Sequence, residues 1–113
     1  MENIRFTDVR YGLTSEVEVC FSRYVHGGIA IRLVSLTHGP WLMVTMFIPG
    51  KVVPMNCVAI KNYAENQGIV DRLIENGVIE PEPITEYLTP SNVMVPIHRL
   101  TPKSECLAYA GTS

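Results

Sequence analysis

Residues 16–35 read EVEVCFSRYVHGGIAIRLVS, and this stretch decides the fold because apolar and polar side chains alternate along it. Within residues 16–23 the apolar side chains Val17, Val19 and Phe21 stand at every second position, which is the pattern of a half-buried strand. Gly27 and Gly28 follow, and glycine readily adopts the positive φ that a tight hairpin turn requires. Because residues 29–35 alternate again, the sequence predicts an antiparallel β-hairpin.

The strand pattern continues on the C-terminal side of this hairpin. Residues 41–48 are apolar on both faces, which predicts a central strand covered on both sides, or covered by a partner chain. A fourth strand is predicted over residues 56–61 and a last strand over residues 92–100. Pro96 lacks a backbone N–H, so it confines the last strand to an edge of the sheet or to a bulge.

One amphipathic helix is predicted between the fourth and the last strand. Apolar side chains recur there with a helical period, at Ile69, Val70, Leu73 and Ile74. Asn62 is one candidate N-cap, and Glu65 three residues later would complete an arrangement like a capping box. Gly77 is placed to end the helix in the left-handed conformation.

The remaining segments are predicted to lie outside the sheet. Residues 80–83, Glu-Pro-Glu-Pro, are expected to form a stiff, exposed acidic linker because proline cannot join a central ladder. Residues 101–113 are polar and small, and we expect a flexible C-terminal tail. The sequence therefore predicts one compact α+β domain over residues 1–100, an antiparallel β-meander sheet of about 4–5 strands with one helix packed on one face.

Length and composition narrow the class of protein. The chain has 113 residues and a formal net charge of −2, which suit one domain and exclude a basic nucleic-acid-binding protein of the usual kind. The first residues lack the apolar core of a signal peptide, and the longest apolar stretch, residues 41–49, is too short to cross a bilayer. Three widely spaced cysteines do not make the disulfide framework of a small secreted protein. We therefore expect a soluble cytoplasmic protein without membrane or direct nucleic-acid contact.

Motifs for catalysis and metal binding are missing from the sequence. The histidines, His26, His38 and His98, are far apart, and none stands beside a pair of cysteines. The sequence has no glycine-rich phosphate loop and no nucleophile elbow, and nothing in it places a general base beside Cys20 or Cys57. We therefore expect a protein that is not an enzyme and that has no catalytic residue, metal or cofactor.

Charge is distributed unevenly along the chain. Residues 65–86 hold six acidic residues and a single base, Arg72, whereas residues 1–61 hold six bases and four acids. An acidic surface on the helix and the linker is either a solvated face that keeps the protein soluble or a docking surface for a basic partner. In the docking hypothesis an aromatic anchor lies beside the carboxylates. The candidate partner-binding residues are then Tyr63, Glu65, Glu75, Glu80, Glu82 and Glu86.

Several stretches of the chain are similar to a known family, namely residues 28–34, 39–49, 58–68, 73–81 and 95–97. They resemble a family of small uncharacterised bacterial proteins carried on phages, plasmids and conjugative elements, over about residues 24–100. The segment KNYAENQG, residues 61–68, is the most specific part, and Ala64 and Gln67 depart from the family pattern. The family has no established activity, so the resemblance implies no catalytic residue and no cofactor.

The resemblance implies a mobile-element protein that disarms its bacterial host. The leading hypothesis is an inhibitor of a host defence system that binds another protein through the acidic surface, such as an anti-CRISPR protein that blocks a CRISPR effector complex. The alternative is a small-molecule binding module, such as a sponge for a cyclic-nucleotide defence signal, with a pocket at a dimer interface built from Arg32, Lys61, Tyr63 and Arg99. A third hypothesis is a housekeeping protein of the mobile element.

A homodimer is also expected from the sequence. One helix can cover only one face of the predicted sheet, and residues 41–48 are apolar on both faces. Association of two copies would hide an uncovered apolar face from water.

Overall fold

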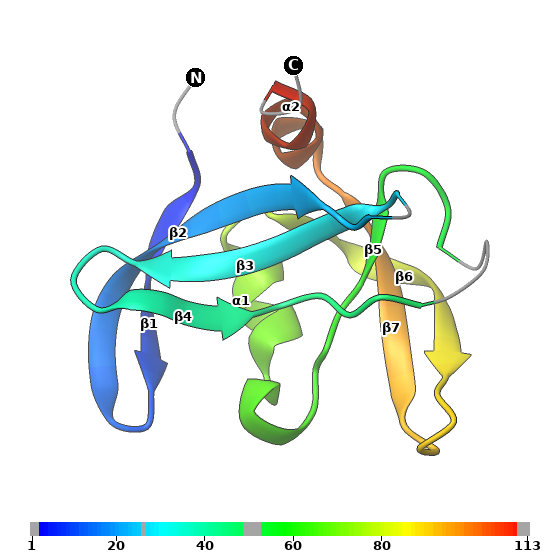
Figure 1. Cartoon of the computed structure of the whole chain (residues 1–113), viewed down its shortest axis with the longest axis horizontal. Helices are drawn as coiled ribbons and strands as arrows, with labels where there is room; N and C mark the ends of the chain where they lie inside the picture. Colours follow the sequence, from blue (N-terminus) through cyan, green and yellow to red (C-terminus); the bar gives the residue numbers. More distant parts are fainter. Residues whose placement is uncertain (1–2, 26, 49–52, 111–113) are drawn as a thin grey trace.

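The computed structural model describes residues 3–25, 27–48 and 53–110, and over these residues it confirms the α+β class. A four-stranded antiparallel sheet has the order β1-β2-β3-β4, and a three-stranded sheet has the order β5-β7-β6. Figure 1 shows the two sheets side by side, with both chain ends at the top of the molecule. The elements are β1 (Arg5–Arg10), β2 (Leu13–Arg23), β3 (Ile29–Ser35), β4 (Gly39–Met43), β5 (Cys57–Ala59), η1 (a 3-10 turn, Ala64–Asn66), α1 (Ile69–Glu75), β6 (Ile79–Leu88), β7 (Met94–Leu100) and α2 (Pro102–Ala110).

The hairpin predicted from residues 16–35 forms as β2 and β3. Phe21 pairs with Ile31 across the two strands, and Ile31 is completely buried. Gly27 and Gly28 both have a φ of +88°, as the predicted turn requires. β1, which the sequence pattern did not reveal, pairs with β2 on its other side, so the first sheet is a meander of four consecutive strands.

The prediction of a central strand over residues 41–48 is wrong. β4 ends at Met43 and lies at the edge of its sheet, after which the chain leaves the sheet and Thr45 bridges to Ile60. The run is apolar on both faces because it passes from one core to another. The structure has a larger and a smaller hydrophobic core. Trp41, Leu42 and Val44 are buried in the larger core. Ile48 is buried in the smaller core, beside β5 and β7.

A homodimer was expected because one apolar face of residues 41–48 would lack cover within a single chain. That reason does not hold for this run. Trp41, Leu42 and Val44 are buried within one chain, and Ile69 and Leu73 of α1 lie in the same core. Residues of the second sheet complete that core, so the cover that the sequence seemed to lack comes from within the chain. Self-association stays a prediction.

The predicted helix is present as α1, and it starts later than Asn62 indicates. Its N-terminal cap position is Gly68, at a φ of +87°, so Asn62 is not the N-cap residue. The Asn62 side-chain Oδ1 nevertheless accepts hydrogen bonds from the backbone N–H groups of Gly68 (3.1 Å) and Val70 (3.2 Å). Val70 is in the first turn, where backbone donors have no partner within the helix, so Asn62 still caps α1 from a distance.

The C-terminal end of α1 confirms the prediction for Gly77. This glycine has a φ of +72°, and its N–H donates to the carbonyl of Ile74 at 3.1 Å. The N–H of Val78 donates to the carbonyl of Leu73 at 2.9 Å. These two bonds form a Schellman motif, which satisfies carbonyls that the last turn would leave unpaired.

Two segments predicted to be irregular are regular elements. Residues 80–83 belong to β6, so the expected acidic linker is an edge strand that pairs with β7. Its prolines are tolerated because the strand lies at an edge and its register shifts on both sides of Pro83. Residues 102–110 form α2 instead of a flexible tail, and Thr101 caps that helix by accepting a hydrogen bond from the N–H of Ser104 at 3.2 Å.

Candidate functional site

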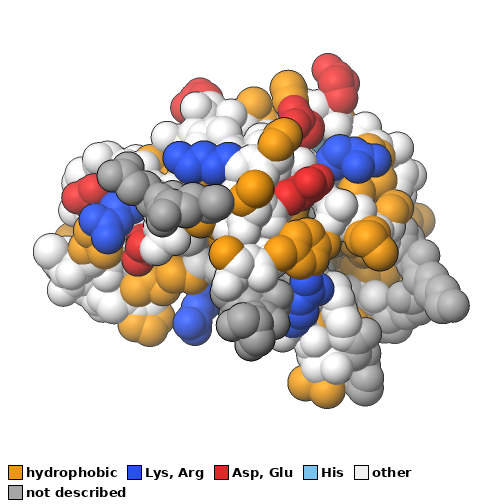
Figure 2. All heavy atoms as spheres, turned by 90° about the horizontal axis from the view of Figure 1, so that it is seen from above, with side chains coloured by type: hydrophobic (Ala, Val, Ile, Leu, Met, Phe, Trp, Pro, Cys, Tyr) orange, Lys and Arg blue, Asp and Glu red, His pale blue; other side chains and the backbone are white. Residues whose placement is uncertain are grey.

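The acidic residues predicted to bind a partner lie on two neighbouring elements. Glu80, Glu82 and Glu86 are on β6, and Glu75 ends α1, which packs beside β6. Glu75, Glu82 and Glu86 are exposed, whereas Glu80 is half-buried. Glu65 belongs to η1, and its side chain lies outside the described part of the structure. On the face seen from above in Figure 2, acidic and basic side chains are interspersed, so neither charge forms a continuous patch there.

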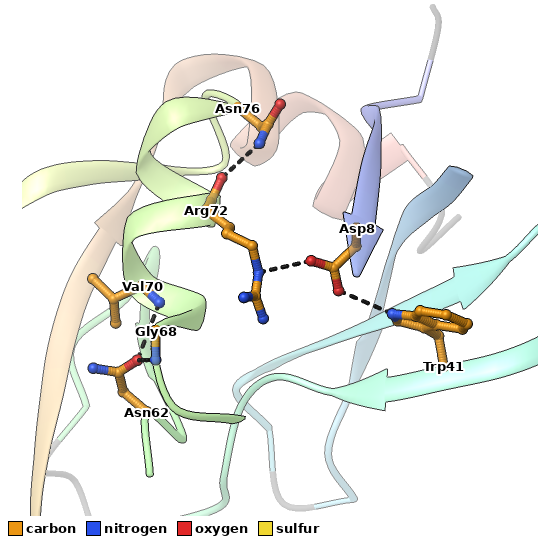
Figure 3. Close-up of polar contacts among 7 residues, drawn as sticks. All are labelled: Asp8, Trp41, Asn62, Gly68, Val70, Arg72 and Asn76. Atoms are coloured by element: carbon orange, nitrogen blue, oxygen red, sulfur yellow. Dashed lines mark hydrogen bonds and ion pairs between the residues drawn. The ribbon is translucent and has the colours of Figure 1, made fainter. Parts of the chain in front are cut away.

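Arg72, the single base of this acidic stretch, is paired with a carboxylate of the first sheet. Its Nε lies 2.7 Å from Oδ1 of Asp8 on β1, a contact of opposite charges whose geometry falls outside that of a hydrogen bond. The Asp8 side chain is completely buried, and the indole N–H of Trp41 donates to its other oxygen at 2.9 Å (Figure 3). Arg72 therefore compensates the buried charge of Asp8. Since Arg72 is the single base of residues 65–86, no other base of that segment can neutralise its exposed acidic residues.

Tyr63, the aromatic residue predicted to anchor a partner, is half-buried and packs against the smaller core. The Nζ of Lys61 lies 5.8 Å from the centre of its ring. Tyr63 lines a hollow of about 200 Å³ together with Phe47, Tyr87 and Pro90. Its ring is therefore fixed within an aromatic setting and is only partly accessible to a partner.

A different set of charged residues surrounds a pocket at the outer edge of β4. This basic pocket has a volume of about 340 Å³, and it is lined by Arg10, Arg32, Leu33, Pro40, Trp41, Leu42, Met43, Lys61 and Asn66. Its three cationic residues come from the end of β1, from β3 and from the segment that follows β5. Among the described residues that line it, none is acidic, so the charges around the pocket are of one sign.

Side chains, rather than another strand, occupy the outer edge of β4. The guanidinium of Arg10 donates to the carbonyl of Trp41, and the side-chain amide of Asn66 donates to the carbonyl of Met43 at 2.7 Å. An edge strand presents unpaired backbone groups to its surroundings, and these two bonds satisfy two of them. They also hold the Arg10 and Asn66 side chains against the pocket.

Two residues that line the basic pocket each have a buried polar atom without a hydrogen-bond partner among the described residues. The atoms are Nε of Arg10, a donor, and Oδ1 of Asn66, an acceptor. A buried polar atom without a partner costs about 1–3 kcal/mol, so nearly all such atoms in folded proteins are paired with protein or with water. Arg10 Nε and Asn66 Oδ1 are therefore polar atoms whose burial is not compensated within the described part of the chain.

The structure brings together part of the residue set expected for a small-molecule site. Arg32 and Lys61 line the basic pocket together, as the alternative hypothesis requires. Tyr63 contacts Lys61 but lines the aromatic hollow instead. Arg99 lies on β7, where it pairs with Cys57, and it is not a lining residue.

Sequence reasoning missed Arg10, Trp41 and Asn66 as residues of this pocket. Arg10 could not be placed because β1 was not predicted, and Trp41 was assigned to a central strand. Asn66 did carry a signal, since it belongs to the segment KNYAENQG, which also supplies Lys61 to the pocket and Asn62 to the start of α1.

The histidines do not converge on one another in the part of the chain that the structure describes. His98 is buried, with Nδ1 2.9 Å from the carbonyl oxygen of Glu80, and His38 stacks on Trp41 with 6.0 Å between ring centres. His26 lies outside the described residues. Within the described ranges, no group of three or more His, Cys, Asp or Glu side chains is arranged to hold a metal ion.

Comparisons with known proteins give no match to this chain: no family model, curated protein or solved structure matches it. No helix within residues 3–25, 27–48 and 53–110 has the length and apolar character needed to span a membrane. The class of protein is therefore described from the fold and the site alone. It is an α+β protein of two antiparallel sheets with a cationic pocket at a sheet edge.

Proposed function

We propose that this protein is a binding module without catalytic activity, and that its basic pocket captures a small molecule carrying a phosphate or another anionic group. The observation that carries the proposal is the convergence of Arg10, Arg32 and Lys61 on one pocket. These residues are far apart in the sequence, so the folded chain assembles the positive charge.

The residue types of the basic pocket suit an organic anion. Guanidinium groups bind phosphate or carboxylate oxygens through paired hydrogen bonds, and an ammonium group adds a compact positive charge. Trp41, Leu42 and Met43 add apolar surface for the rest of the ligand. A volume of about 340 Å³ lies at the lower end of the range of about 300–1,000 Å³ for small-molecule sites, which favours a ligand the size of one nucleotide.

In the bacterial cytoplasm, such a pocket suits a sponge that lowers the free concentration of a nucleotide defence signal. A cyclic dinucleotide carries two phosphates, and a homodimer with two basic pockets would provide a site for each. Sedimentation velocity at high micromolar concentration tests this arrangement. A species of 12.6 kDa alone would exclude the homodimer and leave a ligand the size of one nucleotide.

The proposal is tested by isothermal titration calorimetry of the full chain with nucleoside monophosphates, cyclic mononucleotides and cyclic dinucleotides. Arg32→Glu reverses an exposed charge at the pocket, and Arg99→Glu reverses another exposed arginine on β7, outside the lining. We expect the first variant to lose the binding that the wild type and the second variant share. The proposal fails if no ligand binds the wild type, or if both variants weaken binding equally.

A second candidate function is the inhibition of a host defence protein, such as a CRISPR effector, through the acidic surface of Glu75, Glu82 and Glu86. The observation that favours it is the inward pairing of Arg72 with Asp8, which leaves these exposed carboxylates without a base from their own segment. A partner with a basic surface would be steered toward them. The contact would join two proteins without nucleic acid between them, and its test is a charge reversal described in the Discussion.

A further inference from the structure

β6 is an edge strand, and its outer side has no partner strand in the described part of the structure. The order of the second sheet is β5-β7-β6, so β7 pairs with β6 on one side only (Figure 1). An edge strand presents backbone N–H and C=O groups that can pair with another extended chain. Which groups of β6 point outward follows from the pairing of β7 with its other neighbour, β5.

The backbone groups of Glu86 and Leu88 point away from β7. Pro96 lies opposite Glu86, and its carbonyl faces the other way, because it accepts a hydrogen bond from the N–H of Ile60 at 3.0 Å. In an antiparallel ladder the two residues of such a pair direct their N–H and C=O groups away from each other. Leu88 is two positions further along the strand and repeats the direction of Glu86. None of the described residues pairs with these outward groups.

The two halves of β6 differ in how their outer side is protected. Natural edge strands are guarded against unwanted pairing by prolines and bulges, and the first half of β6 has Pro81, Pro83 and both register shifts. Residues 85–88 contain no proline and pair with β7 in unbroken register. At the edge of β4, by contrast, the side chains of Arg10 and Asn66 occupy outward carbonyls. We call residues 85–88 the open edge of β6.

The side chains beside the open edge favour a particular kind of strand. Glu86 and Leu88 share one face of the sheet, because alternate side chains of a strand point the same way. Leu88 is 55% exposed, and Met94 opposite it on β7 is 50% exposed. An added strand places one side chain beside Glu86 and another, two positions away, beside Leu88. Cross-strand pairing favours a basic residue at the first position and an apolar residue at the second.

We propose that the open edge of β6 binds an extended segment of another protein as an additional strand, and that basic and apolar side chains alternate along one face of that segment. A second copy of this chain is disfavoured at this edge, because antiparallel pairing about Glu86 places two glutamates opposite each other. The inference deepens the second candidate function and rests on it, since it states how a basic partner meets the acidic surface. It does not depend on the basic pocket.

The test is fluorescence anisotropy of the full chain with a labelled peptide of sequence KTVTKTVTK, whose lysines and valines share one face when extended. One derivative carries N-methyl groups on the lysines and valines, and another carries them on the threonines, so each has one backbone edge blocked. We expect one derivative to bind at least about tenfold more weakly than the unmodified peptide, because it loses backbone hydrogen bonds to β6. The other should bind like the unmodified peptide, and a peptide with glutamate in place of lysine should not bind.

Two substitutions at one position separate charge from backbone pairing. Glu86→Gln removes only the charge and should weaken binding of KTVTKTVTK by about two- to threefold, as for an exposed ion pair. Glu86→Pro also removes an N–H that points away from β7, so the sheet loses no bond, and binding should weaken at least about tenfold. The matched control is Glu16→Gln, which removes an exposed carboxylate from the interior strand β2 and should leave binding unchanged.

The remaining outcomes each refute a defined statement. If both N-methylated peptides bind as tightly as the unmodified one, strand addition is refuted while binding of a basic partner stands. If KTVTKTVTK does not bind the wild type, the second candidate function fails as well. If the wild type sediments as a dimer that Glu86→Pro dissociates, the occupant of the edge is a second copy and not another protein. Should Glu86→Pro not fold, the two N-methylated peptides still decide.

Discussion

The indole N–H of Trp41 donates a hydrogen bond to the carboxylate of Asp8, with 2.9 Å between Nε1 and Oδ2. Asp8 belongs to β1 and Trp41 to β4, the two edge strands of the four-stranded sheet, which are not neighbours in its ladder. The sheet must curl for its first and last strands to come this close. Arg72 of α1 meets the same carboxylate, so one buried charge ties together both sheet edges and the helix (Figure 3).

Asp8→Ala should destabilise the protein, because it leaves the Arg72 charge without its opposite charge and the Trp41 indole N–H without its acceptor. Breaking a buried ion pair costs about 3–5 kcal/mol, but water reaches part of the Arg72 side chain, which is 33% exposed. We therefore expect a loss of about 2 kcal/mol in the free energy of unfolding, measured by urea denaturation.

The matched control for Asp8 is Glu16→Ala, which removes an exposed carboxylate from the neighbouring strand β2. It should change stability by no more than about 0.5 kcal/mol. Asp8→Ala combined with Arg72→Met should cost less than the sum of the single variants, because the second change removes the uncompensated charge. Equal effects of Asp8→Ala and Glu16→Ala would show that the buried pair contributes nothing.

Asn62→Ala should lower the free energy of unfolding by about 1 kcal/mol, the usual cost of losing a side chain that caps a helix. Its oxygen accepts from the N–H groups of Gly68 and Val70, and alanine leaves both donors unpaired. Urea denaturation measures the change, and Gln67→Ala, an exposed neighbour, is the control. Unchanged stability together with lost ligand or partner binding would identify the segment as a contact site instead.

Stability should fall at alkaline pH. Burial raises the pKa of the Cys57 thiol above its ordinary value of 9.0 and that of the Tyr24 phenol above 10.0. The native chain holds these protons at a pH where the unfolded chain releases them, so their contribution is complete below about pH 9 and is lost as the pH rises through the folded pKa values. Unfolding by urea at pH 8 and at pH 10 measures the difference.

Cys57→Ala isolates the contribution of this thiol to the alkaline loss of stability. The variant should show a smaller drop in stability between the two pH values than the wild type, with the remainder due to Tyr24 and to Cys20, a thiol whose pKa is also raised by burial. Cys106→Ala removes an exposed thiol and is the control. An equal drop in the wild type and in Cys57→Ala would mean that this thiol does not contribute.

Reversal of Glu75, Glu82 and Glu86 to lysine tests the acidic surface. These side chains are exposed, so each change should move stability by no more than about 0.5 kcal/mol. Association with a polylysine peptide should slow sharply, and wild-type association should itself weaken with salt, because surface charges are screened over about 8 Å at physiological ionic strength. Stopped-flow fluorescence measures the rates. Unchanged kinetics in a folded triple variant would leave this surface as a solvated face.

Local pattern was enough to predict some elements and not others. The β2–β3 hairpin and the end of α1 at Gly77 depend on residues a few positions apart, and both formed as predicted. The apolar run of residues 41–48 was misread because a central strand and a segment that crosses between two cores have the same pattern. α2 gave no signal because its apolar residues do not gather on one helical face, and Thr101 holds its start.

The proline-containing edge strand β6 is a second element that local pattern was not enough to predict. Pro81 and Pro83 exclude a central strand, but they do not exclude an edge strand whose register shifts around them. Whether such a segment joins a sheet depends on the strand beside it, here β7, which lies further along the chain. The exposed carboxylates of Glu82 and Glu86 are therefore held on a strand and not on a loose linker.

The sequence by itself determined the α+β class, the first hairpin, the presence of one amphipathic helix and the acidic excess of residues 65–86. Each of these depends on the order of nearby residues and on the periods of strand and helix. Only the tertiary structure decided that Arg10, Arg32 and Lys61 meet at one pocket, and that Arg72 pairs with Asp8. The curl of the first sheet and the packing of α1 against it set those distances, and no local pattern encodes them.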